Sequence, residues 1–406
     1  MATFRDATVD GLSKLIVLWN HGDAFRKPKE KDKPGQPCDG GCFWMAGNLF
    51  HTVVEGMVKV GLQHDTYNIG KEALEYFDEC IPKTAKPREW RDKCGFWVDD
   101  YGWWGIAFMQ AYSASDTLNY DPSMKQKFAL YAQDCWEALN ACWNTTPISW
   151  KKNGTQYTIT GGIPNTSNGS PMLAGRNCVT NECYWRLSSI LGQTFGDDYL
   201  DSKANANDFF LQAKAQSILF DPSLLVYERF FGLPKTEHAD WTWLGDQGLF
   251  AICCYFNKQG TPGVFDQAQA INIIDHVQTN KKKKTASGVL HEELAPYSQY
   301  QLDYGCGKGT FMRNLAIIND ARHRGSPSEA PYDSYIKLNA MAVWKNRQPD
   351  GIFPYYWDAE SPEPDPTSWE YRQDTANAVL HAAGLSALNA SLPWLEDQPI
   401  DKVGGG

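Results

Sequence analysis

Two adjacent carboxylates, Asp99 and Asp100, stand in the aromatic segment FWVDDYGWWGIAFMQAY, residues 96–112. Hydrolysis of a glycosidic bond needs two carboxyl groups: one attacks or stabilises the anomeric carbon, and the other protonates the leaving oxygen. Adjacent residues at a helix start hold their carboxyls roughly 5–6 Å apart, which suits the ~5–5.5 Å spacing of enzymes that retain anomeric configuration. Aromatic faces stack on the apolar face of a sugar ring, and the pair is surrounded by Trp97, Tyr101, Trp103 and Trp104. The segment therefore predicts acid–base chemistry on a carbohydrate.

A plainer interpretation of any Asp-Asp pair before a helix is a cap that also complements the helix dipole. The chain has such a pair in Asp197 and Asp198, within GDDYLD. Asp99 and Asp100 differ because the helix that follows them is apolar nearly all round, as a buried helix is. Burial and like charge raise one pKa of such a pair, so that one acid and one carboxylate coexist. We therefore interpret Asp99 and Asp100 as the functional pair.

Helical periodicity recurs along the chain, and strand patterns are scarce. Amphipathic, charge-rich helices are expected at residues 7–20, 70–80, 123–142, 204–218, 264–279 and 331–346. They alternate with apolar, small-residue helices at residues 43–60, 97–113, 180–192, 244–257, 307–319 and 374–389. Six buried helices inside six half-exposed ones predict an all-α fold, the (α/α)6 barrel. Because this pattern extends along the whole sequence, we expect residues 1–406 to form a single catalytic domain. A long loop insert is expected at about 144–175, with β-hairpin character in TQYTITGGI.

The inner helices of such a barrel run in one direction, so their N-terminal N–H groups gather on one face. Polar and aromatic residues near those starts are the candidate substrate ligands. Besides the aromatic residues around the Asp pair, they are Trp44, Asn48, Asn181, Glu182, Trp243, Asp246, Gln247, Lys308 and Arg313. The amides and acids among them also suit helix caps, and Arg313 also suits a structural pairing with an acid such as Asp303.

Composition narrows the class of protein. The 406 residues carry 38 basic and 48 acidic side chains, a formal net charge of −10. Such a balance is unfavourable for wrapping nucleic acid or binding anionic membrane. No apolar run approaches the roughly 18 residues that span a bilayer. Sixteen Trp, 19 Tyr and 19 Phe are enough both to fill a large core and to line a groove.

Cysteines and sequons favour a secreted protein. Eleven Cys are present, and Cys38 with Cys42 and Cys178 with Cys183 are spaced to pair as short staples. Neither spacing is that of a zinc site, and no neighbouring His cluster completes four ligands. Sequons for N-glycosylation occur at Asn144, Asn153, Asn165, Asn168 and Asn389. Residues 1–10 lack the pattern of a signal peptide. We expect a secreted or cell-wall-associated monomer.

Four segments carry a resemblance to a known family. VDDYGWWGIAFMQAY is similar to the catalytic segment of glycoside hydrolase family 76, the endo-α-1,6-mannanases. GDQGLFAICCYF (245–256) resembles the family's N-Q-G helix, with Asp246 where Asn is common. GKGTFMRNLA (307–316) and WKNRQPDGIFPYYW (344–357) resemble its later motifs. The long insert at 144–175 departs from the family pattern.

The resemblance implies that Asp99 is the nucleophile and Asp100 the general acid/base of a retaining double displacement without metal or organic cofactor. The expected substrate is an α-linked polysaccharide or oligosaccharide, above all α-1,6-mannan. Three alternatives remain: a transglycosylase that uses the same pair, a toroidal sugar epimerase that uses His51 or His381, and a carbohydrate-binding protein without activity. Two intact carboxylates argue against the last.

Overall fold

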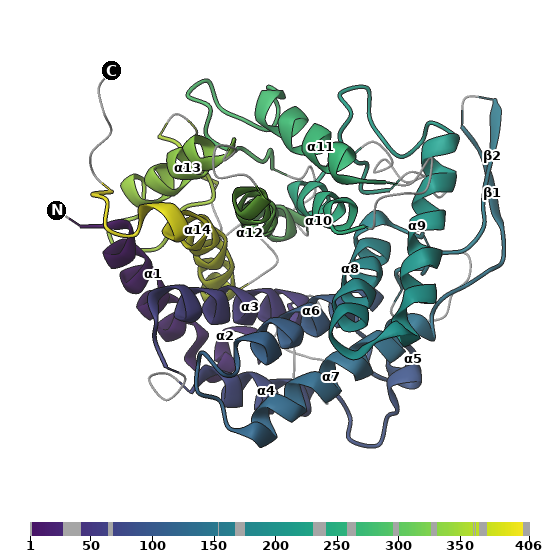
Figure 1. Cartoon of the computed structure of the whole chain (residues 1–406), viewed down its shortest axis with the longest axis horizontal. Helices are drawn as coiled ribbons and strands as arrows, with labels where there is room; N and C mark the ends of the chain where they lie inside the picture. Colours follow the sequence, from purple (N-terminus) through teal and green to yellow (C-terminus); the bar gives the residue numbers. More distant parts are fainter. Residues whose placement is uncertain are drawn as a thin grey trace.

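Twelve long helices form two concentric rings in the computed structural model of the chain (Figure 1). The structure describes residues 2–26, 42–63, 68–152, 154–166, 175–229, 241–257, 265–294, 300–325, 331–359, 361, 363–364 and 372–400. None of the helices in these ranges is long and apolar enough to cross a membrane.

The inner ring consists of α3 (Phe43–Val60), α6 (Val98–Ala114), α8 (Cys178–Phe195), α10 (Leu244–Tyr255), α12 (Gln301–Gly325) and α14 (Gln373–Leu395). Each inner helix packs on the next, and α14 packs back on α3, so the ring closes. The outer ring consists of α1 (Phe4–Trp19), α4 (Ile69–Cys80), α7 (Pro122–Asn140), α9 (Leu200–Ala215), α11 (Gln267–Thr279) and α13 (Asp333–Lys345). Short elements join them: α2 (Asp23–Arg26), α5 (Trp90–Lys93), and the 3-10 turns η1 (Asn20–Gly22), η3 (Pro87–Glu89) and η4 (Asp197–Tyr199). The predicted (α/α)6 barrel is confirmed.

Glycines set the close spacing of the inner ring. A Cβ at Gly309 of α12 would lie 2.6 Å from the Cα of Ala383 in α14. A Cβ at Gly248 of α10 would lie 2.8 Å from the Cα of Phe311 in α12. Both distances are far below normal carbon–carbon contact, so only glycine allows these backbones to approach. The glycines that look like helix breakers in the sequence are packing residues here.

Helix starts differ between the two rings. Several outer helices carry their own caps: Thr3 forms a capping box with Asp6, and Asp121 accepts from the N–H groups of Ser123 and Met124. The inner helices α6 and α10 follow Trp97 and Trp243, whose side chains make no capping hydrogen bond. Their first N–H groups are instead met by side chains from elsewhere in the chain, and this brings polar groups to that face.

The insert between α7 and α8 begins with a hairpin of β1 (Ile148–Lys152) and β2 (Thr155–Ile159), paired in register from Ile148 with Ile159 to Lys152 with Thr155. This hairpin confirms the strand character predicted for TQYTITGGI. Figure 1 shows it outside α9 at the edge of the molecule. Gln212 of α9 and Gln216, which follows the last residue of α9, bond the backbone of Thr160 and Thr158. These bonds fasten β2 and the residue after it to the outer ring.

The predicted pairing of Cys178 with Cys183 is wrong. Both are free and buried within the first turns of α8. Cys38, the predicted partner of Cys42, lies outside the described residues. Cys80, at the end of α4, is the disulfide-bonded cysteine of the described residues. A disulfide is therefore present, in accordance with the expectation, but at a different place.

Candidate active site

Buried and half-buried carboxyl groups from four inner helices influence one another at one end of the barrel. They are Asp99 and Asp100 at the start of α6, Glu182 in α8, Asp246 in α10 and Asp303 in α12; Asp99 and Asp303 are the half-buried ones. The charge of Asp99 raises the pKa of both Asp100 and Asp303, after the larger effect of burial. Such mutual effects require the groups to lie near one another. The predicted convergence of the inner-helix starts is therefore found for these acids.

Asp99 and Asp100 differ in their surroundings. Burial raises the pKa of Asp99 to about 6; its own backbone N–H, then the Asn165 amide and the charge of Arg229, oppose that rise. Burial, and next the charge of Asp99, raise the pKa of Asp100 well above its ordinary value. Asp100 is only 1% exposed, and neither of its oxygens has a hydrogen bond of normal geometry from a described residue. At neutral pH the pair thus holds one carboxylate, Asp99, beside one protonated acid, Asp100.

Glu182 and Asp246 form a second carboxyl pair, on neighbouring helices. Both side chains are fully buried. Burial raises each pKa well above normal; next, the charge of Asp246 raises the pKa of Glu182, and the charge of Glu228 raises that of Asp246. Two buried carboxyl groups that repel in this way cannot both be ionised, so the pair holds at least one proton at neutral pH.

Three indole rings meet beside these acids. The ring centres of Trp44 and Trp103 are 5.4 Å apart, and Trp243 stands edge-on to both at 6.1 and 6.2 Å. Gly245 and Gly307 make room for Trp243, because a Cβ at either position would lie 2.3 Å from its ring. The indole N–H of Trp44 bonds Asp303 and lowers its pKa, against the larger rise from burial. These three predicted residues are brought together.

Two residues of the loop before α10 belong to the same cluster. Arg229 forms an ion pair with Glu228, with Nε 3.3 Å from Oε1. Tyr304 of α12 donates its hydroxyl to the other oxygen of Glu228 at 2.9 Å. Glu228 and Arg229 cannot be found from the sequence pattern, because an irregular loop carries no periodic signal. Asp303 is missed as a site residue because α12 begins at Gln301, six residues before the predicted start at Gly307.

Several predicted ligands have structural partners instead. Asn181 bonds the N–H of Ile163 at 2.8 Å and its carbonyl at 3.2 Å, and Gln247 clamps the backbone of Val226 in the same way at 2.8 Å on both sides. Each amide is fully buried and fixes the loop that precedes its own helix. These two residues shape the site through the loops that carry its other members.

Tyr101 and Trp104 lie in the aromatic core between α4 and α6. Trp104 donates its indole N–H to the carbonyl of Phe43 at 2.8 Å and packs on Phe77 and Phe108. Both side chains are fully buried. Trp97, by contrast, is 47% exposed just before α6.

Lys308 and Arg313 lie deeper along α12 than the sequence suggests, because that helix starts earlier. Lys308 is buried among the rings of Tyr355, Tyr356 and Trp357 and donates to the carbonyl of Tyr355. Burial lowers its pKa to about 8.

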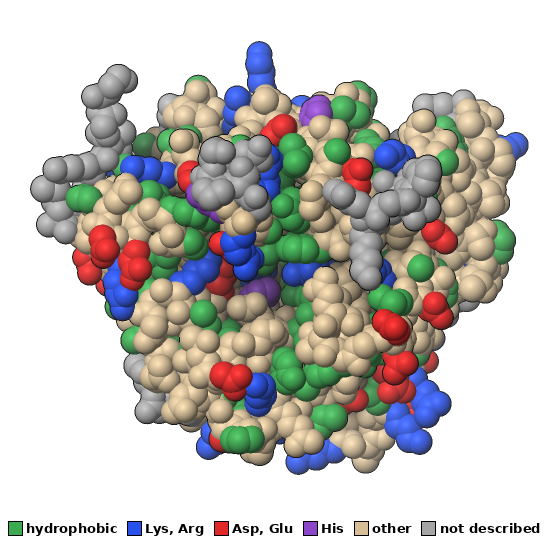
Figure 2. Space-filling model, in the orientation of Figure 1, with side chains coloured by type: hydrophobic (Ala, Val, Ile, Leu, Met, Phe, Trp, Pro, Cys, Tyr) green, Lys and Arg blue, Asp and Glu red, His purple; other side chains and the backbone are tan. Residues whose placement is uncertain are grey.

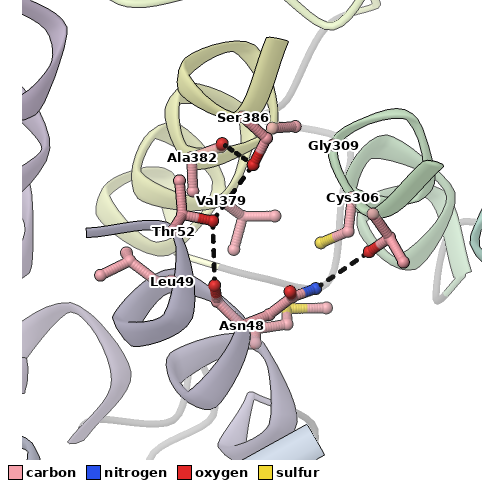
Figure 3. A pocket seen from close by; sticks show the side chains of 11 residues that line it. Asn48, Leu49, Thr52, Cys306, Gly309, Val379, Ala382 and Ser386 are labelled. Carbon is pink, nitrogen blue, oxygen red and sulfur yellow. Dashed lines mark hydrogen bonds between the residues drawn. The ribbon is translucent and has the colours of Figure 1, made fainter. Parts of the chain in front are cut away.

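Arg313 donates to Asn48 of α3, so these two predicted ligands bond each other. The suggested pairing of Arg313 with Asp303 is not among its hydrogen bonds. Asn48 also lines a small cavity between α3, α12 and α14, with Thr52, Cys306 and Ser386 (Figure 3). The cavity volume is about 10 Å³, roughly the minimum for one water molecule. It is too small for a sugar.

The two histidines of the epimerase alternative are placed as core residues. His381 accepts from the N–H of Phe353 at 3.2 Å, bonds the carbonyl of Gly11 at 2.8 Å, and stacks on the Phe353 ring. Burial lowers its pKa to about 4. His51 is buried, and its pKa is well below normal for the same reason. A side chain bonded on both ring nitrogens cannot serve as acid and base for a substrate.

Comparisons with known proteins identify the fold. No protein-family model and no curated protein matches the sequence. Among solved structures, an inactive variant of the GH76A α-1,6-mannanase from Salegentibacter sp. HEL1_6, in complex with α-1,6-mannotriose, has a TM-score of 0.67 at 15% identity, covering 96% of this chain and 99% of that one. Dfg5 from Chaetomium thermophilum, in complex with glucosamine, also has a TM-score of 0.67, at 17% identity over 97% and 91% of the two chains. A GH76 α-mannanase from Bacteroides thetaiotaomicron has a TM-score of 0.62 at 14% identity over 94% and 95%. The chain thus has the fold of these proteins.

Proposed function

We propose that the chain is a retaining endo-glycosidase of glycoside hydrolase family 76 that hydrolyses α-1,6-linked mannan. The observation that carries the proposal is the split protonation of Asp99 and Asp100 at the start of a buried helix. A retaining glycosidase needs one ionised nucleophile and one protonated acid within a short distance. The pair meets this electrostatic requirement without a metal or an organic cofactor.

In this mechanism Asp99 attacks the anomeric carbon, and Asp100 gives its proton to the departing glycosidic oxygen. The charge of Asp99 disappears when it is esterified, so the pKa of Asp100 falls and Asp100 becomes a carboxylate that can accept a proton from water. Water then attacks the glycosyl-enzyme, Asp99 leaves as a carboxylate, and Asp100 regains its proton. Trp44, Trp103 and Trp243 supply stacking surfaces beside the reacting sugar, and the Glu182–Asp246 pair supplies donor and acceptor groups for its hydroxyls.

The solved structures support the family and the substrate class. The inactive Salegentibacter enzyme carries asparagine in place of two consecutive aspartates and is described with α-1,6-mannotriose. Asp99 and Asp100 are likewise consecutive, and the likeness extends over nearly the whole of both chains. We propose the same reaction for this chain, as one catalytic domain acting outside the cell.

Surface charge accords with an uncharged polysaccharide as partner. On the face seen in Figure 2, Lys and Arg side chains are interspersed with Asp and Glu and form no continuous basic patch. The formal net charge of −10 is likewise unfavourable for a polyanionic partner and compatible with an uncharged one.

The test is hydrolysis of α-1,6-mannan by wild type, Asp99→Asn, Asp100→Asn and the matched control Asp197→Asn. Asp197 lies in η4, is exposed, and belongs to the other Asp-Asp pair of the chain. We expect each site variant to lose at least three orders of magnitude in turnover and the control to match wild type. An active Asp99→Asn variant, or a wild type without activity on any α-mannan, would refute the proposal.

The same assay at high oligosaccharide concentration separates hydrolysis from glycosyl transfer. Transfer to a sugar uses the same two carboxyl groups and redistributes chain lengths, which hydrolysis alone cannot do. Products longer than the starting oligosaccharide would identify the chain as a transglycosylase.

A further inference from the structure

Asn165 caps the catalytic helix from a distant part of the chain. Its Oδ1 accepts a hydrogen bond from the backbone N–H of Val98 at 3.2 Å. Val98 is the first residue of α6, and the preceding Trp97 provides no side-chain cap. Asn165 therefore satisfies one of the free N–H groups at the helix start, as a local Asn or Asp usually does.

The amide that caps Val98 lies beside the carboxyl of Asp99, the next residue, and lowers its pKa, after the larger lowering effect of the Asp99 backbone. A side-chain amide has an acceptor oxygen and a donor NH₂ group, so Asn165 can serve the Val98 N–H and the Asp99 carboxylate together. A donor beside a carboxylate favours its ionised form. Asp100, one residue further, has a lowering interaction with the backbone of Trp97 but with no side-chain amide of the described residues. One amide thus distinguishes two neighbouring carboxyl groups.

The loop that carries Asn165 is fixed on both sides. Two residues earlier, the backbone of Ile163 is clamped by Asn181 of α8. Asn165 donates its own backbone N–H to the carbonyl of Gly175 at 3.0 Å. The amide is therefore presented to the start of α6 by a held segment rather than by a free arm.

Other titratable groups also face Asp99: three acids, one thiol and one arginine. Asp100 shares its helix; Glu228 and Arg229 approach from the loop before α10, Asp303 from α12 and Cys183 from α8. Arg229 already has an ion pair with Glu228, which partly neutralises its charge. Asn165 is the neutral donor in this group.

We propose that Asn165 is a positioning residue: through its bond to the Val98 N–H it places a neutral donor beside Asp99, which holds Asp99 as the ionised nucleophile next to Asp100. The inference rests on the proposed function, since it assigns Asn165 a part in the same reaction. It also gives the long insert a role at the site, because the insert supplies this residue.

The test compares Asn165→Asp and Asn165→Ala with Asn144→Asp. Asn165→Asp keeps an acceptor for the Val98 N–H but places a second negative charge beside Asp99. Asn165→Ala removes both the Val98 cap and the donor beside Asp99. Asn144 is an exposed asparagine of the same insert, and its Oδ1 accepts a hydrogen bond from the N–H of Thr146. Asn144→Asp therefore adds the same negative charge away from the site.

For Asn165→Asp we expect the acidic limb of the kcat/KM profile to move up by about one pH unit, because a neighbouring carboxylate disfavours ionisation of Asp99. For Asn165→Ala we expect an upward shift of the limb and a roughly tenfold lower kcat. The control keeps the wild-type profile. The contrary result is a wild-type pH profile for Asn165→Asp together with a loss of activity at all pH values for Asn165→Ala. It would mean that Asn165 only caps the helix, and it would overturn the proposal.

A second readout does not depend on activity. The titration of the Asp99 carboxyl, followed by ¹³C NMR and assigned with Asp99→Asn, should move upward in Asn165→Asp. If wild type fails to cleave mannan but this shift is present, the proposed function fails and the role of Asn165 stands. If Asp99→Asn is inactive but neither the limb nor the titration moves in Asn165→Asp, the proposed function stands and the role of Asn165 fails.

Discussion

Asp99→Asn should make the protein more stable at neutral pH while removing its activity. The folded chain raises the pKa of Asp99 from an ordinary value of 3.8 to about 6. The folded state therefore binds this proton more tightly than the unfolded state does, and stability falls as pH rises through that interval. Asparagine has nearly the same shape and no charge, so it escapes this loss.

The size of the effect follows from the shift. One pKa unit corresponds to about 1.36 kcal/mol, so the shift of Asp99 costs of the order of 3 kcal/mol once pH exceeds about 6. Unfolding entropy of ~2.1 cal/mol/K per residue gives a protein of this length ~0.85 kcal/mol/K at its Tm. The variant should then melt about 3–4 °C above wild type at pH 7.5, and at nearly the same temperature near pH 3.5.

Differential scanning calorimetry of both proteins between pH 3.5 and pH 8 tests this prediction, with Asp197→Asn as the exposed control. The difference in Tm should grow between about pH 4 and pH 6 and remain constant above. A difference that does not depend on pH, or a variant less stable than wild type at pH 7.5, would refute the assignment of Asp99 as a buried carboxyl with a raised pKa.

Two further predictions concern catalysis. The kcat/KM of the wild type for mannan should rise through about pH 6 as Asp99 ionises, and should decline only at a higher pH where Asp100 loses its proton; a profile that falls through pH 6 would reverse the roles of the pair. Gly307→Ala places a Cβ 2.3 Å from Nε1 of Trp243, so the indole must move; we expect a KM at least tenfold higher and a loss of about 1–3 kcal/mol in stability. Gly175→Ala, whose Cβ would meet no described atom within 4 Å, is the control, and equal KM values for the two variants would remove Trp243 from the site.

The sequence predicts the fold well because helical periodicity and burial are local patterns. The alternation of charged and apolar helices determines the two rings, and the ends of α3 agree with the predicted 43–60. The predicted start of α12, Gly307, is six residues late, so Gly305 falls outside the predicted helix while Gly307 and Gly309 fall inside it. In the barrel these glycines let α12 approach Trp243 and α14, a reason that only the packed structure reveals.

The site is predicted less completely. The Asp99–Asp100 pair and the three indoles follow from residue type and helix position. Arg313 and Asn48 bond each other, and Asn181 and Gln247 clamp loops, because a buried polar side chain must find a partner and often finds one in the protein. Glu228, Arg229 and Asn165 come from irregular segments, where sequence spacing carries no information about distance in space.

The anomeric configuration of the first product tests the central claim most directly. Asp99 as nucleophile and Asp100 as acid require two displacements at the same carbon, which together retain configuration. Cleavage of an α-1,6-mannan oligosaccharide, followed by ¹H NMR from the first seconds, should show the α-anomer of the new reducing end before mutarotation. Initial appearance of the β-anomer would mean a single displacement by water, and Asp99 could not then be the nucleophile.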